Sequence, residues 1–236
     1  MAHVTLIHPP TILNMDSLSY NNSIPPLGLA YMSAATKKAG HQVTIVDSPG
    51  EAIEVFHPIK NVSIKDLYIH GLTPDEIVER IPENSEIVGI THMFLHAWPV
   101  IRDLIKKIKE AHPHQKLVMG GETPSAWWQY MMKELQEIDF CVVGEGEGTF
   151  IDMLECFDKD TPFSEVANLV YRDKGVPKRS LTKRKRIREI NELSWPDWEA
   201  FDIDAYLDRD YSSGVNRGTS MPMLATRGCP YQCTFC

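Results

Sequence analysis

Short apolar runs alternate with amphipathic stretches from the start of the chain to residue 158. Five runs are nearly continuous in β-branched and other apolar residues and are closed by Pro, Gly, Asp or Thr: HVTLIH, QVTIVD, EIVGIT, KLVMGG and DFCVVGEG. Continuous runs of this kind are typical of parallel strands that are covered on both faces. The alternation therefore predicts βα units around a mostly parallel, buried sheet.

Apolar residues recur at helical spacing between these runs. One predicted helix begins after Pro26, stops at Gly40 and turns one face inward, formed by Leu27, Ala30, Tyr31, Ala34 and Ala35. A second places Val100, Ile101, Leu104, Ile105 and Ile108 inward and Lys106, Lys107 and Lys109 toward solvent. Further helices are expected at 74–80, 125–135 and 149–157, and an irregular insertion at 51–73. The pattern predicts a flavodoxin-like (Rossmann-like), doubly wound, five-stranded α/β domain over residues 1–165.

A different organisation is expected after residue 165. The stretch ANLVYRDKGV predicts a hairpin that turns at Asp173-Lys-Gly175. The basic stretch PKRSLTKRKRIREI fits either a nucleic-acid patch or a solvated connector, and the lack of interleaved aromatics favours the connector. The aromatics of LSWPDWEAFD are expected to pack this linker, residues 166–220, onto a neighbouring domain. PMLATRG is expected to be a buried strand that opens a further domain at residues 221–236.

Composition narrows the class of ligand. The chain has 236 residues and a net charge of −8, which gives no general electrostatic reason to bind nucleic acid or an anionic membrane. A small-molecule ligand fits better. The sequence shows no signal peptide and no apolar run near the length that spans a bilayer, so we expect a cytoplasmic protein. The odd number of cysteines, 5, disfavours a disulfide framework.

The loops at the carboxyl ends of the predicted strands are the expected ligand site, because doubly wound sheets bind ligands there. They are the long polar loop PPTILNMDSLSYNNSIPP after the first strand, Thr91–His96 after the third, and the Gly-rich turns Gly120–Pro124 and Gly144–Gly148 after the fourth and fifth. Any one Gly-rich turn can be an ordinary connection, but several on the same edge favour a cleft lined by backbone N–H groups. After the first strand stands His8-Pro9-Pro10 rather than GxGxxG, which disfavours nicotinamide dinucleotides.

Three cysteines lie in the last eight residues with the spacing CxxxCxxC: Cys229, Cys233 and Cys236. Three thiolates can ligate three irons of a 4Fe-4S cluster and leave the fourth iron open. An open iron can be chelated by the amino and carboxylate groups of a methionine-type cofactor. A structural zinc site, the alternative, needs a fourth ligand. With its aromatic residue before the last cysteine, the motif resembles that of radical S-adenosylmethionine (SAM) enzymes.

The resemblance extends along the chain. The stretches PPLGLAYMSAATKKAGHQVTIVD, EIVGITH, VMGGETPS, DFCVVGEGEGTF, NLVYR and LSWPDWEAFD are similar, in that order, to the cobalamin-binding domain and linker of cobalamin-dependent radical SAM proteins. The resemblance implies that this is the N-terminal part of such an enzyme, ending at the first strand of a partial TIM barrel. It also implies cobalamin contacts at the carboxyl edge of the sheet, from Pro9, Pro10, Thr91, His92, Gly120, Gly121, Glu122, Gly144, Glu145 and Gly146.

The activity implied by the resemblance uses cobalamin, SAM and the 4Fe-4S cluster. A methyltransferase of this family methylates an unactivated carbon or phosphorus centre of a small molecule through methylcobalamin and a 5'-deoxyadenosyl radical, with electrons from a donor such as flavodoxin or ferredoxin. The alternatives are the anaerobic magnesium-protoporphyrin ester cyclase reaction and a corrinoid carrier without catalysis. A tRNA methylthiotransferase is disfavoured, because only Cys141 and Cys156 remain to ligate its second cluster.

The chain departs from many cobalamin domains in one respect. It has no DxHxxG motif, whose histidine is the lower ligand of cobalt. His8 and His92 lie at the ends of the two strands that flank the switch point and are geometrically possible replacements, although such histidines are more often plain loop residues. The lower axial ligand therefore stays open at this stage.

Overall fold

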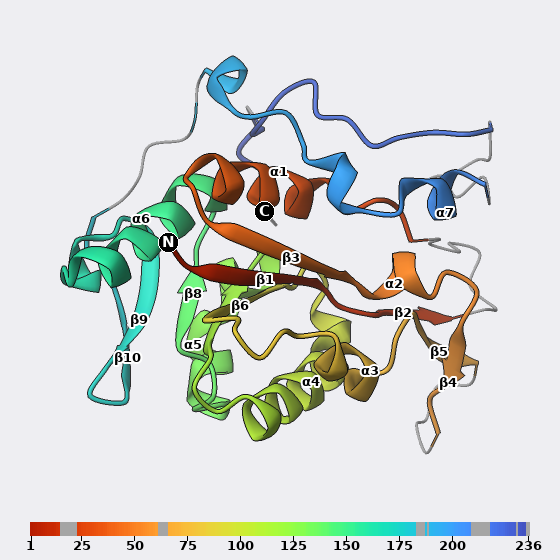
Figure 1. Cartoon of the computed structure of the whole chain (residues 1–236), viewed down its shortest axis with the longest axis horizontal. Helices are drawn as coiled ribbons and strands as arrows, with labels where there is room; N and C mark the ends of the chain where they lie inside the picture. Colours follow the sequence, from red (N-terminus) through yellow and green to blue (C-terminus); the bar gives the residue numbers. More distant parts are fainter. Residues whose placement is uncertain are drawn as a thin grey trace.

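The computed structural model describes residues 1–14, 23–60, 66–182, 187, 189–208, 218–229 and 231–234. Its main sheet (Figure 1) has seven strands, in the spatial order β10 (Val176–Arg179), β9 (Leu169–Asp173), β8 (Phe140–Val142), β7 (Lys116–Gly120), β6 (Ile87–Thr91), β1 (His3–His8) and β3 (Gln42–Asp47). The five predicted strands are all present and run parallel to one another. The predicted hairpin adds β9 and β10 to the same sheet in antiparallel fashion.

The chain changes direction across the sheet after β3. From β1 it runs outward to β3, then returns past β1 to form β6, β7 and β8 in order. The switch point therefore lies between β1 and β6. Their carboxyl ends are where a doubly wound sheet leaves a crevice for a ligand.

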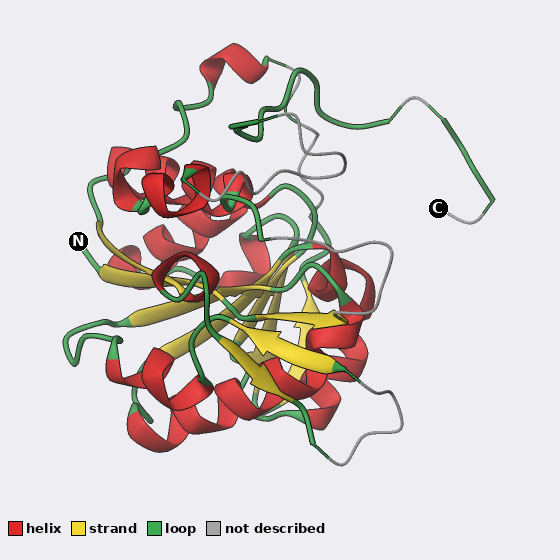
Figure 2. Ribbon diagram, turned by 90° about the vertical axis from the view of Figure 1, so that its right-hand side faces the viewer, coloured by secondary structure: helices red, strands yellow, loops and turns green. Residues whose placement is uncertain are grey.

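Helices cover both faces of the sheet, as Figure 2 shows. The apolar cluster on one face joins the sheet to α3 (Pro74–Glu79), α4 (Trp98–Ala111) and α5 (Glu122–Glu134). The cluster on the other face joins it to α1 (Leu27–Lys38) and α6 (Gly146–Lys159). Shorter helical segments are α2 (Ser48–Glu51), α7 (Ile203–Leu207), η1 (Leu95–Ala97), η2 (Phe163–Glu165), η3 (Ile190–Glu192) and η4 (Trp198–Ala200). The predicted doubly wound α/β fold with a mostly parallel sheet is confirmed.

The two helices whose inner faces were predicted residue by residue differ in how well that prediction holds. All five apolar residues assigned to the inner face of α4 are buried. In α1 the fully buried residues are Leu29, Ala30, Ser33 and Thr36, of which the apolar pattern included Ala30 alone. The reason is that α1 is covered twice, by the sheet and by the linker: Ser33 donates a 2.5 Å hydrogen bond to Asp197 of the linker.

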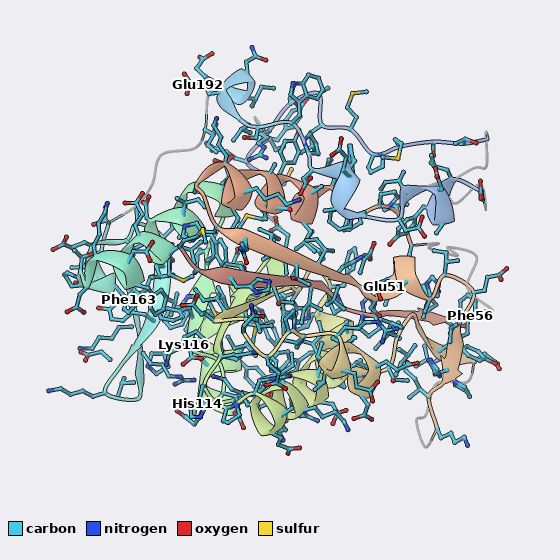
Figure 3. All side chains as sticks on the ribbon, viewed as in Figure 1. Glu51, Phe56, His114, Lys116, Phe163 and Glu192 are labelled. Atoms are coloured by element: carbon cyan, nitrogen blue, oxygen red, sulfur yellow. The ribbon has the colours of Figure 1, made fainter. Side chains whose placement is uncertain are left out.

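A second, three-stranded sheet corrects two expectations. Strand β2 (Thr11–Asn14) lies in the segment expected to be a polar loop, and β4 (Phe56–Pro58) and β5 (Leu67–His70) lie in the expected irregular insertion. Antiparallel pairing of these distant segments satisfies backbone groups that a loop would leave to water. His70 is buried here: its ring stacks on Phe56, labelled in Figure 3, and its Nδ1 bonds the Ser23 hydroxyl at 2.9 Å.

The linker follows the prediction in part. Its hairpin turns through Lys174 and Gly175, both at positive φ, as a two-residue turn requires. Trp198 and Phe201 pack against the apolar cluster that contains α1, whereas Trp195 is 90% exposed. Residues 183–186 and 188 of the basic connector lie outside the described residues.

The strand predicted at PMLATRG is not formed. Residues 221–228 run without helix or strand and are largely exposed, Met223 at 86%. A strand requires a neighbour to pair its backbone groups, and no strand in the described ranges lies beside this segment. Apolar character alone was therefore a poor predictor here. Among the helices that the structure describes, none has the length and apolar character needed to cross a membrane.

Candidate functional site

A cavity of about 1070 Å³ lies where the carboxyl ends of β6, β7 and β8 meet α1 and α6. Its floor is apolar, from residues of the sheet and the two helices such as Leu6, Val118, Val142, Met32 and Phe150. Its rim is formed by the loops that follow the three strands. In Figure 3, Lys116 marks the amino end of β7, the strand whose carboxyl end, at Gly120, reaches the cavity. A volume of this size is at the upper end of the range for small-molecule sites.

Glycines keep the rim of the cavity bare. A Cβ added to Gly120 or to Gly144 would meet no atom within 4 Å, so the missing side chains leave open space. Gly121 has a different role: its φ is +103°, and an added Cβ would lie 2.7 Å from the carbonyl oxygen of His92. A bulky flat ligand can thus approach the backbone at Gly120 and Gly144, and the shape of this edge fits a corrinoid.

Seven of the ten residues predicted to contact cobalamin line the cavity: Thr91, Gly120, Gly121, Glu122, Gly144, Glu145 and Gly146. Pro9, Pro10 and His92 do not line it, and all three are buried. Pro9 and Pro10 link β1 to β2, so the second sheet accounts for their position. The residues at the ends of β6, β7 and β8 therefore line the cavity and those on the β1 side do not, and their contact with cobalamin stays a prediction.

His92 is an interior residue. Its side chain is packed parallel to Trp98, with ring centroids 5.7 Å apart, and its Nε2 lies 3.0 Å from the carbonyl oxygen of Phe94. Its Nδ1 is buried and has no hydrogen-bond partner among the described residues. Burial, helped by the nearby His96, lowers the pKa of His92 to about 4. His92 is thus held neutral inside the protein and is not presented to the cavity.

His8 belongs to a separate polar cluster at the carboxyl ends of β1 and β3. Its Nδ1 lies 2.7 Å from a carboxylate oxygen of Asp47, and the hydroxyl of Tyr206 donates to the same carboxylate at 2.9 and 3.0 Å. Tyr206 is fully buried, and burial followed by the charge of Asp47 raises the pKa of its hydroxyl. This cluster joins α7 of the linker to the sheet and does not line the cavity.

Two residues that the sequence analysis did not single out meet at the cavity wall. Glu147, in the first turn of α6, accepts a 2.5 Å hydrogen bond from Arg227. The guanidinium carbon of Arg227 also lies 5.0 Å from the ring centroid of Tyr31 on α1. Leu224, Thr226 and Gly228 of the same segment line the cavity too. The available signal was a charged residue two positions before the first cysteine of the motif.

The cysteines fall into two groups. Cys141 in β8 and Cys156 in α6 are buried, and burial raises the pKa of Cys141 to about 12. Cys229 and Cys233 are exposed free thiols, and Cys236 lies outside the described residues. The part of the chain that the structure describes contains no group of three potential metal ligands.

Comparison with known proteins gives consistent matches. Residues 17–154, more than half of the chain, match the B12 binding domain family. The chain is 26% identical to cytidylyl-2-hydroxyethylphosphonate methyltransferase of Streptomyces wedmorensis, covering 95% of this chain and 47% of that protein. It is also 26% identical to the anaerobic magnesium-protoporphyrin IX monomethyl ester cyclase of Synechocystis, covering 90% and 38%.

Solved structures of similar fold include two radical SAM enzymes. OxsB, solved with aqua-cobalamin and SAM, matches 84% of this chain and 25% of its own with a TM-score of 0.59 at 15% identity. The methyltransferase TsrM from Kitasatospora setae, solved with tryptophan substrate and a SAM analogue, matches 76% and 30% with a TM-score of 0.54 at 15% identity. At this identity the likeness concerns the fold.

The chain spans less than half the length of these curated relatives. Methyltransferases and cyclases are both among them, as the sequence resemblance implied. The family match covers β3, β6, β7 and β8, whose loops include three of the strand ends at the cavity. The chain therefore belongs to the B12 binding domain family.

Proposed function

We propose that this chain is the cobalamin-binding part of a cobalamin-dependent radical SAM methyltransferase, and that the cavity at the carboxyl edge of the sheet is its corrinoid site. The observation that carries the proposal is the bare glycine rim at Gly120 and Gly144, over an apolar floor and within the region that matches the B12 binding domain family. The methyltransferase relatives support the reaction class.

Different residues of the cavity would have different roles in binding the corrinoid. Gly120 and Gly144 leave space for the ring system against the backbone. The apolar floor at Leu6 and Met32 would exclude water from beneath it. Bound cobalamin would supply the chemistry for transfer of a methyl group from a donor to an acceptor. We infer that the chain itself contributes enclosure and alignment and no acid or base at the reacting centre.

We further propose that Cys229, Cys233 and Cys236 ligate a 4Fe-4S cluster that binds SAM. The support is the CxxxCxxC spacing, which provides three thiolates and leaves one iron for a small-molecule chelator. The exposure of Cys229 and Cys233 leaves them accessible for cluster assembly. Reduction of such a cluster requires an electron donor of the flavodoxin or ferredoxin class, and the acceptor of the methyl group would be a small molecule.

Neither His8 nor His92 is placed to be the lower ligand of cobalt. His92 is enclosed and His8 is engaged by Asp47, and neither lines the cavity. We therefore expect the EPR spectrum of Co(II) cobalamin bound to this chain in its base-off form to lack nitrogen superhyperfine splitting. A splitting that disappears in His8→Ala or His92→Ala would contradict this part of the proposal.

Equilibrium dialysis with hydroxocobalamin tests the binding site. The wild-type chain should retain the cofactor, and Gly120→Val should retain much less, because its side chain enters the cavity without meeting any atom of the protein. The control is Lys116→Val at the opposite, exposed end of the same strand. Absence of retention up to roughly 1 mM, about −4 kcal/mol, would refute the corrinoid site. Equal loss in both variants would refute the role given to Gly120.

The cyclase relatives make oxidative ring closure of a porphyrin side chain the second candidate reaction. The two reactions differ in the fate of the methyl group of SAM. Mass analysis of products formed from methyl-deuterated SAM separates them, because only methyl transfer places the label in the product.

A further inference from the structure

Arg227 places a cation in the wall of the cavity, two residues before the first cysteine of the motif. Its side chain is 14% exposed and that of its partner Glu147 is 11% exposed. Water is therefore largely excluded from this ion pair, and loss of either partner would leave an uncompensated buried charge. A short contact of this kind holds a chain segment far more firmly than a pair on the surface.

The same helix offers a direct comparison. At the other end of α6, Lys159 and Glu155 form an ion pair of 2.6 Å, one helical turn apart. Their side chains are 64% and 51% exposed. Such a pair is screened by water and joins residues that are already neighbours. The Arg227 pair instead joins positions 80 residues apart in the sequence.

Tyr31 completes the site for Arg227. Its ring lies on α1, the helix that packs beside α6, and the guanidinium is 5.0 Å from its centroid. The cation is thus attracted by a carboxylate from one helix and an aromatic face from the other. This arrangement is specific for arginine, whose flat guanidinium can serve both partners at once.

Two further contacts hold the linker to the turn before α6 and to α1. The side chain of Glu145 accepts a 2.8 Å hydrogen bond from the backbone N–H of Ile187, and Asp197 pairs with Lys37 of α1 at 2.6 Å. Figure 1 shows the linker crossing over α1 on the side away from the sheet. Further along the chain, Leu224 and Thr226 line the cavity next to Arg227.

We propose that Glu147 and Tyr31 form a docking site for Arg227 that holds the segment leading to the cysteines against the corrinoid cavity, so that docking of this segment and occupancy of the cavity favour each other. Arg227 is then a positioning residue, and the acidic turn after β8 serves the linker as well as the cofactor. The docking itself follows from the contacts of this chain, whereas its coupling to the cavity rests on the proposed function.

Trypsin measures the docking directly. The protease must take the arginine side chain into its own pocket, so cleavage after Arg227 requires that the ion pair open. In the intact 236-residue chain, release of the peptide 228–236, followed by mass spectrometry under reducing conditions, reports this single cleavage. Glu147→Gln should raise its initial rate about tenfold or more, because cleavage tracks the population of the undocked form. Glu155→Gln, at the exposed pair, should leave the rate unchanged.

Substitutions of Tyr31 keep the test decisive if Glu147→Gln fails to fold. Tyr31→Phe retains the aromatic face and should cleave at the wild-type rate. Tyr31→Leu removes the face and should cleave about threefold faster. Equal rates in wild type, Glu147→Gln and Tyr31→Leu would overturn the docking site. Faster cleavage in Tyr31→Phe equal to that in Tyr31→Leu would overturn the role of the ring.

Hydroxocobalamin tests the coupling. Bound cofactor should slow the release of peptide 228–236 from the wild-type chain. By reciprocity, Glu147→Gln should weaken hydroxocobalamin binding, and Glu155→Gln should not. Binding to wild type without any effect on cleavage, and with equal affinity for Glu147→Gln, would overturn the coupling. No binding to wild type would overturn the proposed function, while the cleavage rates without cofactor would still decide the docking site.

Discussion

Acidification should destabilise this protein through His92. The imidazole is enclosed by Trp98, bonds the carbonyl of Phe94 through Nε2 and has a pKa of about 4 in the folded state, mainly because burial disfavours its charged form. In the unfolded chain the same group has its ordinary value of 6.5. The unfolded state therefore binds the proton first as the pH falls, and the free energy of unfolding decreases between pH 6.5 and pH 4.

The size of the effect follows from the two values. A difference of 2.5 between 6.5 and about 4 corresponds to about 3 kcal/mol once the pH is below both. Between pH 7 and pH 5 the loss should be about 2 kcal/mol. Such a loss is a large fraction of the stability of an ordinary domain.

This loss of stability can be measured by urea unfolding. The free energies of unfolding of the wild type and of His92→Gln are compared at several pH values between 7 and 4.5. The amide of glutamine can still donate to Phe94 but takes up no proton, so other titrating groups cancel when the two curves are subtracted. The difference should grow by about 2 kcal/mol from pH 7 to pH 5 in favour of the variant. His114→Gln, which replaces an exposed imidazole, is the control and should follow the wild type. Parallel curves for wild type and His92→Gln would refute the buried neutral imidazole.

Three further outcomes are expected. Cys141, buried and with a pKa of about 12, should react with iodoacetamide only after unfolding, whereas Cys229 should react in the native chain, as peptide mass analysis will show. Gly121→Ala should lower the free energy of unfolding by about 1–3 kcal/mol in urea titrations, because of its positive φ and the nearby carbonyl, and Gly120→Ala should leave it almost unchanged. Tyr206→Phe, which removes a buried donor to a carboxylate, should cost about 1–3 kcal/mol in the same assay; an unchanged midpoint would contradict that contact.

Features that depend on neighbours along the chain could be predicted from the residues alone. The strand runs, the spacing of apolar residues from Val100 to Ile108 and the turn at Lys174-Gly175 are local signals, and each was confirmed. The position of the glycines at the carboxyl edge is local for the same reason, since Gly120 ends β7 and Gly144 lies two residues after β8, and their contact with cobalamin stays a prediction. The terminal cysteine spacing is also local, and the cluster it predicts stays a proposal.

Contacts between segments that are distant in the sequence could be found only in the folded chain. Ser33 is buried in α1 because the linker lies over it, and Pro10 turns away from the cavity because β2 pairs with β5. His92 follows a strand at the switch point, yet its ring packs inward on Trp98. The ion pair between Glu147 and Arg227 spans 80 residues and has no periodic signature. Periodicity reports whether a residue is buried, but the identity of the group that buries it is set by contacts between segments that the sequence order keeps apart.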